Sequence, residues 1–387
     1  MKNRYLTLSI ICLVFLFIQF GGGTFIANAD ELSDSISEQL NNIDLSGLEG
    51  FFNNIDNLPN GVDFFTYVFS MLNGEMSLSF DSVFSYLFNA FFNNVFNSLP
   101  TFISIIAISV FCSIMQSVRS SFLSDSTADM ILFVSLISII LLLTSEIVSV
   151  WKSTQIAIKN IANLTEIMSP IILTLMVASG GTVSASVYQP TVVFLSNGVI
   201  NIFLIAVLPI VGLIIVFNVI SNFSDSVKLN KFTELFSGVI KWIIGIIITV
   251  FSIFITVQGI SSATFDGISI KATKFAISNS VPIIGGFLKD GFDLVVAGSI
   301  LIKNVIGITC VFALFYVIIS PVLYIAAFSL LLKLVCAVIE PIVDTRIVSF
   351  CSSTSKCITY LAVSLLAVGF MLFLTILLIT FSASVFI

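Results

Sequence analysis

A chain of 387 residues in which 58% of the residues are hydrophobic and only 9% are charged cannot fold as an ordinary soluble domain, whose charged fraction is about 25%. The composition therefore predicts an integral membrane protein. The net charge of −6 gives no indication of nucleic-acid binding, because that function needs a basic surface.

The N-terminus has the three parts of a secretory signal peptide. Lys2 and Arg4 form a basic start, residues 6–20 an apolar core, and Ala27-Asn28-Ala29 a small-residue cleavage site. This order and spacing predict cleavage between Ala29 and Asp30. Whether or not cleavage occurs, the following chain is expected to begin outside the cytoplasm.

Residues 30–99 are acidic and contain no Lys or Arg. The ten acidic residues are Asp30, Glu31, Asp34, Glu38, Asp44, Glu49, Asp56, Asp63, Glu75 and Asp81. An absence of basic residues is compatible with the external side of a membrane. The second half of this region is rich in Phe and Asn, and its aromatic spacing indicates an amphipathic helix. The chain thus divides into a signal peptide (1–29), an acidic extracytoplasmic region (30–99) and a membrane domain (100–387).

Six apolar runs in the membrane domain are near or above the length of about 18–20 residues that a membrane-spanning helix needs. They are 101–118, 130–150, 192–220, 239–260, 305–332 and 357–381. The expected fold is an all-α polytopic membrane protein with about six or seven transmembrane helices. Pro321 leaves a second interpretation of the fifth run, a tight hairpin of two shorter helices.

A shorter apolar run, 167–178, is followed by the small and polar residues SGGTVSASVYQP at 179–190. Such a run ending in Gly-Gly and then Pro is typical of a half-helix or re-entrant turn. If it dips in and returns, seven basic residues lie inside (Arg119, Lys228, Lys231, Lys241, Lys333, Arg346, Lys356) and six outside (Lys152, Lys159, Lys271, Lys274, Lys289, Lys303). If it spans, five lie inside and eight outside. The positive-inside rule therefore favours six full spans and an external C-terminus.

Most of the polarity of the membrane domain gathers in residues 266–308. This stretch contains four lysines, three aspartates, six glycines and Pro282. Charge is costly at membrane depth, so the segment should lie at the interface, line a protein cavity or contact another subunit. The glycines and proline would permit broken or re-entrant backbone. Elsewhere, Glu146 and Glu340 are expected to make polar contacts at the interface or within the bundle, with a proton or ion pathway as the alternative.

No catalytic or metal-binding pattern is present. The chain contains no His, and its six Cys form no paired C-x-x-C spacing; nucleotide-binding and hydrolase motifs are also missing. We therefore expect a protein that is not an enzyme, with no catalytic residues, no metal and no cofactor. Because it has no ATP-binding loop, energised transport would need a partner ATPase or an ion gradient.

The segments at 179–190 and 266–308, together with the signal peptide and the length, resemble the stage III sporulation protein AE family of endospore-forming Firmicutes. The resemblance implies a multi-pass subunit of a channel-like or secretion-like complex, located in the mother cell membrane that surrounds the forespore. It also implies partners: other membrane subunits, a secretion-type ATPase, ring-forming subunits and, indirectly, a forespore membrane protein. The implied role is support of forespore development and late forespore gene expression.

The resemblance implies functional regions in this chain, but it implies no catalytic residues. The residues expected to line a passage or contact another subunit are Gly180, Gly181, Pro190, Lys271, Lys274, Pro282, Gly285, Gly286, Lys289, Asp290, Asp293, Gly298, Lys303 and Asn304. We expect the two segments to face each other near the bundle axis. The alternatives are an independent secondary transporter, which predicts an internal repeat that the sequence does not show, and a purely structural membrane anchor.

Overall fold

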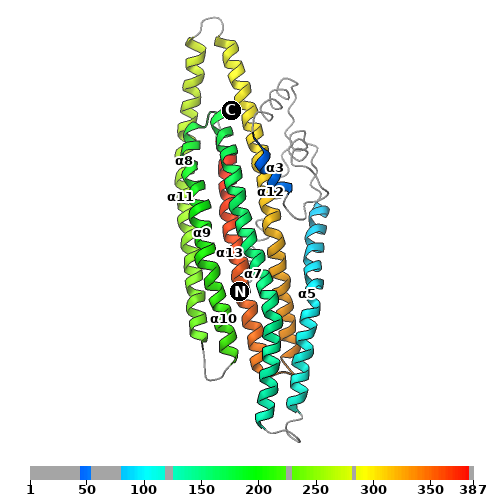
Figure 1. The fold of residues 1–387 in the computed structure, drawn as a ribbon. Helices are drawn as coiled ribbons and strands as arrows, with labels where there is room; N and C mark the ends of the chain where they lie inside the picture. The colour runs from blue at the N-terminus through cyan, green and yellow to red at the C-terminus, as the bar shows by residue number, and fades with distance from the viewer. Residues whose placement is uncertain (1–43, 54–79, 118–124, 224–228, 281–284, 383–387) are drawn as a thin grey trace.

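The computed structural model describes residues 44–53, 80–117, 125–223, 229–280 and 285–382. Within these residues the chain is helical (Figure 1) and contains six helices long and apolar enough to cross a membrane. The predicted all-α polytopic fold is confirmed to this extent. The signal peptide and its cleavage site lie outside the described residues.

The main helices run in alternating directions along one bundle (Figure 1). Their bounds are α5 Phe80–Ser117, α7 Asp125–Ala178, α8 Thr182–Val193, α9 Ile200–Ile202, α10 Leu208–Phe223, α11 Asn230–Ser280, α12 Gly285–Ile339 and α13 Thr345–Phe381. Two π-helical segments, Phe194–Val199 and Phe203–Val207, join α8, α9 and α10 into one rod. A short helix, α3 (Ser46–Asn53), lies against α7.

Several helices are much longer than a membrane requires. The helix α7 has 54 residues and α12 has 55, which correspond to about 80 Å each, against a hydrocarbon core of about 30 Å. The upper ends of α11 and α12 extend past the turn between α7 and α8 (Figure 1). This end of the bundle, within the described residues, is therefore built from helices.

Two expectations about broken helices are wrong. Residues 167–178 form the last part of α7, which passes Pro170 without ending, so they are not a separate half-helix. Likewise α12 continues through Pro321 as one helix, which excludes the hairpin. Both helices continue past their proline because the contacts that they make with neighbouring helices outweigh the loss of one backbone hydrogen bond. The helix α5 also crosses position 100 without a break.

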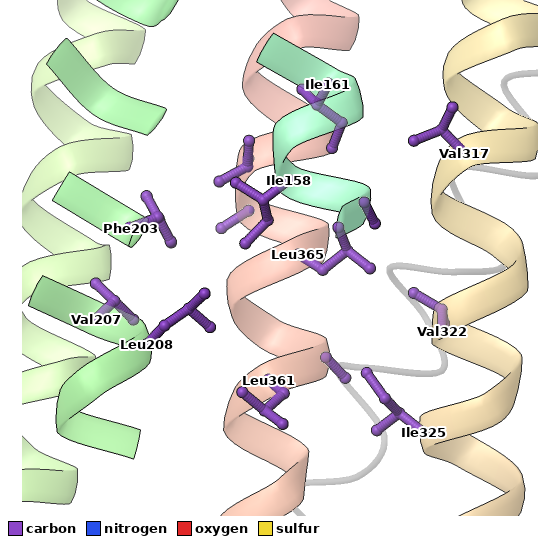
Figure 2. Packing of buried hydrophobic residues seen from close by; sticks show 14 of the residues in the cluster. Ile158, Ile161, Phe203, Val207, Leu208, Val317, Val322, Ile325, Leu361 and Leu365 are labelled. Carbon is purple, nitrogen blue, oxygen red and sulfur yellow. The ribbon is translucent and has the colours of Figure 1, made fainter. Parts of the chain in front are cut away.

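The core is an aliphatic interior to which most long helices contribute. Figure 2 shows Ile158 and Ile161 of α7 close to the level of Phe203, Leu365 and Val317, which come from three other helical segments. The helix α13 is the most buried of the six candidate spans and α11 the least. The helices α12 and α13 share the most extensive contact, and they form the centre of the bundle.

Gly307 lets α12 and α13 approach closely. A Cβ atom at this position would lie 2.9 Å from the Thr380 Cβ atom and would overlap the outer atoms of that side chain. We expect Gly307→Ala to lower the free energy of unfolding by about 1–3 kcal/mol, as overpacking does. Thermal unfolding in detergent measures the effect. The control is Gly291→Ala in the same helix, where a Cβ meets nothing within 4 Å; an equal loss in both variants would contradict the close packing.

Candidate functional site: a polar cluster at the end of the bundle

The turn between α7 and α8 is a glycine-dependent helix end. The amide of Gly181 donates to the carbonyl of Met176 at 2.8 Å, and the amide of Gly180 donates to the carbonyl of Val177 at 2.9 Å. This pair of bonds is a Schellman motif, which requires the left-handed conformation at its first residue outside the helix. Gly180 has a φ of 87°. The predicted turn at Gly180 and Gly181 is therefore real, but it joins two long helices and is not a re-entrant dip.

We expect Gly180→Ala to cost about 1–2 kcal/mol, because a Cβ atom at positive φ meets the following carbonyl. Hydrogen–deuterium exchange of the amides at 179–182 should then be faster than in the unsubstituted protein. Gly245→Ala is the control, since Gly245 is inside α11 and an added Cβ has open space. Unchanged exchange at the turn in Gly180→Ala would show that the left-handed conformation is not needed.

Asp266, a residue of α11, caps the N-terminus of α8. One carboxylate oxygen, Oδ1, accepts hydrogen bonds from the backbone amides of Val183 at 3.1 Å and Ser184 at 3.2 Å. Gly181, at the N-cap position, has no side chain that could accept them. The first amides of a helix lack intrahelical partners and carry partial positive charge, so a carboxylate there is favourable. Asp266 is fully buried.

Lys303, a residue of α12, caps the C-terminus of α13 with a positive charge. Its Nζ atom donates a hydrogen bond to the carbonyl of Ser382, which is the C-cap residue of α13. A cation is favourable at this end of a helix. Lys303 is also fully buried, and its charge interacts with that of Asp266. A buried anion thus caps the N-terminus of α8, and a buried cation caps the C-terminus of α13.

Two further contacts fix the antiparallel register of α8 against α11. The hydroxyl of Thr191 donates to the side-chain oxygen of Gln258, and the rings of Phe194 and Phe254 lie 6.0 Å apart. Thr191 and Gln258 are each eight residues from Val183 and Asp266 along their helices, so both contacts belong to one antiparallel pairing. The start of segment 179–190 therefore lies against Asp266, the first residue of segment 266–308.

The cluster retains unused hydrogen-bonding capacity. Within the described part of the chain, Asp266 Oδ2, Ser184 Oγ and Asn304 Oδ1 are buried and make no hydrogen bond. Buried polar atoms are usually satisfied by protein or by ordered water. These three oxygens make the end of the bundle a polar location inside an otherwise apolar protein.

The structure brings only some of the predicted residues to this cluster. Gly180 and Gly181 form the turn, Lys303 is central, Asn304 is its neighbour in α12, and Gly298 is buried in the same helix. Pro190 and Lys271 are exposed, and Asp293 is half-buried. Gly285, Gly286, Lys289 and Asp290 belong to the first turns of α12, Lys274 belongs to α11, and Pro282 lies outside the described residues.

The most important partner was missed as an individual residue. Asp266 begins the polar stretch, but nothing in its local sequence indicates that it caps a helix that starts 84 positions earlier, at Thr182. Ser382 was also missed, because it acts through its backbone carbonyl, which the residue type does not indicate. One sequence signal could have suggested the contact. Asp266 lies in an apolar region and needs a partner, and the helix that follows Gly180-Gly181 has no capping side chain of its own.

Glu146 makes a second polar contact inside the bundle. Its carboxylate accepts hydrogen bonds from the Thr101 hydroxyl at 3.1 Å and the Tyr324 hydroxyl at 3.0 Å, which joins α5, α7 and α12. The expected polar contact within the bundle is confirmed. Glu340 is exposed beside the turn between α12 and α13.

These features define a class: a multi-pass α-helical membrane protein whose helix ends are closed by buried charges. A family model described as stage III sporulation protein AE matches residues 62–383, and the chain belongs to this family. It is similar to a protein named stage III sporulation protein AE from Bacillus subtilis (strain 168), with 28% identity over 275 residues, which cover 70% of this chain and 68% of that protein. No solved structure matches.

Proposed function

We propose that this chain is a membrane subunit of a channel-like or secretion-like complex that links mother cell and forespore during sporulation. Its place would be the mother cell membrane around the forespore, with the acidic region and the end of the bundle that carries the polar cluster on the outer side. The role would be to support forespore development and late forespore gene expression after engulfment. The family match over 62–383 carries this proposal.

The partners would be other membrane subunits of the same complex. The sequence has no nucleotide-binding motif, so a secretion-type ATPase would supply energy from a separate chain. Ring-forming subunits and a forespore membrane protein would lie on the outer side, and the lipid bilayer would surround the spans. We propose no catalytic activity for the chain itself.

The geometry of the cluster supports a docking role more than a conducting one. A passage lined by broken helix ends needs free backbone groups facing water. Here the start of α8 is capped by Asp266 and the end of α13 by Lys303, so these two ends are closed. We infer that the cluster fixes the relative positions of α8, α11, α12 and α13, and that the projecting ends of α11 and α12 are available to a partner.

The experiment is deletion of the gene in its sporulating host, with forespore size and late forespore gene expression measured after engulfment. We expect a block after engulfment that the unsubstituted chain restores. Normal spores in the deletion strain would contradict the proposal and favour the independent transporter. Restoration by a chain that lacks 80–117 but keeps the rest would favour the simple anchor.

A further inference from the structure

One face of α7 is polar along the half of the helix that leads to α8. Lys152, Lys159 and Glu166 follow one another at intervals of seven residues and are exposed, and Asn163 is exposed between them. Seven residues are almost two helical turns, so the three charges lie on one face. This face is distinct from the cluster at the end of the bundle.

The opposite side of α7 at the same level belongs to the aliphatic core. Ile158 and Ile161 point into the interior together with Phe203, Leu365 and Val317 (Figure 2). Outward-facing neighbours on α7 and on the adjoining rod are apolar, as Ile156, Ile202 and Ile205 show. Exposed lysines beside such a surface are costly in contact with lipid. The charged face of α7 is therefore expected to face water or a polar partner rather than lipid.

Within the described residues this polar partner is missing. Neither Lys152 nor Lys159 makes a hydrogen bond or an ion pair there. By contrast, the exposed Lys231 pairs with Glu234 at 2.9 Å on α11. The two lysines of α7 are therefore available to an acidic partner.

The N-terminal region is already anchored beside this face. Leu48 and Phe52 of α3 are buried, and Gly47 lies so close to Ile167 of α7 that an added Cβ would be 3.0 Å from it. Ile167 is rotated by roughly 80° from Lys159 and roughly 60° from Lys152 around the helix axis. The chain that enters α3 therefore reaches α7 at the edge of the charged face.

The chain just before α3 has the complementary charge. Residues 30–43 contain Asp30, Glu31, Asp34 and Glu38 and no Lys or Arg. Lys159 lies about 12 Å and Lys152 about 22 Å along α7 from Ile167. The nine residues from Glu38 to Gly47 span at most about 30 Å, so the carboxylates of this segment reach both lysines.

We propose that the acidic segment 30–43 docks along the charged face of α7 and that its carboxylates pair with Lys152 and Lys159. Three observations carry the proposal: the charge complementarity, the anchor of α3 at Ile167, and the length of chain that precedes it. The segment would cover the polar face and tie the N-terminal region to the bundle. The proposal stands apart from the proposed sporulation function, since it concerns one chain only.

A carbodiimide that joins carboxylates to amines without a spacer tests the pairing in purified full-length protein in detergent, with the products mapped by mass spectrometry. The expected products join Asp34 or Glu38 to Lys159 or Lys152 within one chain. They should disappear in Lys152→Gln/Lys159→Gln and in Asp34→Asn/Glu38→Gln. The Lys231–Glu234 pair is the internal positive control.

Two results would overturn the proposal. One is formation of the Lys231–Glu234 product with no product at Lys152 or Lys159. The other is products at these lysines that join two chains, which a mixture of isotopically light and heavy protein reveals, because that would make a second copy the occupant. Products that join the two lysines to carboxylates outside 30–43 of the same chain would equally contradict it.

Discussion

Replacing Asp266 by alanine is expected to lower the free energy of unfolding by about 3–5 kcal/mol, the range for removing one partner of a buried charged pair. The substitution removes the acceptor for the amides of Val183 and Ser184 and leaves them buried at the start of α8. It also removes the anion whose charge interacts with Lys303. Thermal unfolding of the purified protein in detergent measures the loss.

Asp266→Asn is the matched control for this prediction. Asparagine keeps an oxygen that accepts from the two amides and is a good capping residue, but it has no charge to balance Lys303 or the helix dipole. Its expected loss is clearly smaller than that of the alanine variant. If Asp266→Ala unfolds at the same temperature as the unsubstituted protein, the capping contact does not stabilise the fold.

Replacing Lys303 by alanine is expected to have an effect of similar size, again about 3–5 kcal/mol. The carbonyl of Ser382 loses its donor, and the carboxylate of Asp266 becomes a buried charge without a compensating cation. We expect a lower unfolding temperature and earlier protease cleavage near the end of α13. Limited proteolysis in native membranes measures the second effect.

Lys271→Ala is the matched control for Lys303→Ala, because Lys271 is a lysine of the neighbouring helix α11 but is exposed. Lys271→Ala should change the unfolding temperature and the protease cleavage little. The double variant Asp266→Ala/Lys303→Ala should lose less than the two single variants together, since each single change leaves the other charge alone. Strictly additive losses would show that the two charges act independently.

The sequence predicts the six apolar helices well, because a span is defined by local length and hydropathy. It predicts the extent of α7 poorly. Lys152 and Lys159 interrupt the hydropathy pattern, so the run appears to end at Val150, yet the helix continues to Ala178. A helix continues past charged residues when these lie on an exposed face while Ile158 and Ile161 on the other face stay in the core.

The candidate site was predictable as a pair of regions rather than as a set of contacts. Gly180-Gly181 is recognisable as a helix boundary because glycine favours the left-handed conformation. The pairing of Asp266 with the start of α8 depends on how two distant helices are aligned, and no local pattern records that alignment. The expected broken helices are wrong within the described residues, because α7 continues through Pro170 and α12 through Pro321 where packing against other helices favours a continuous helix.

One register of α8 against α11 places Val183 and Ser184 beside Asp266, and Thr191 beside Gln258. A cysteine pair at Thr191 and Gln258, in a background without other cysteines, tests this register without altering Asp266. A protease site placed in 224–228 separates the two helices after mild oxidation in native membranes. The control pair is Thr191→Cys with Lys271→Cys, about 20 Å farther along α11. We predict fragments that stay joined until reduction for Thr191→Cys/Gln258→Cys alone. Fragments that separate without reduction, or that stay joined equally in the control, would contradict this register.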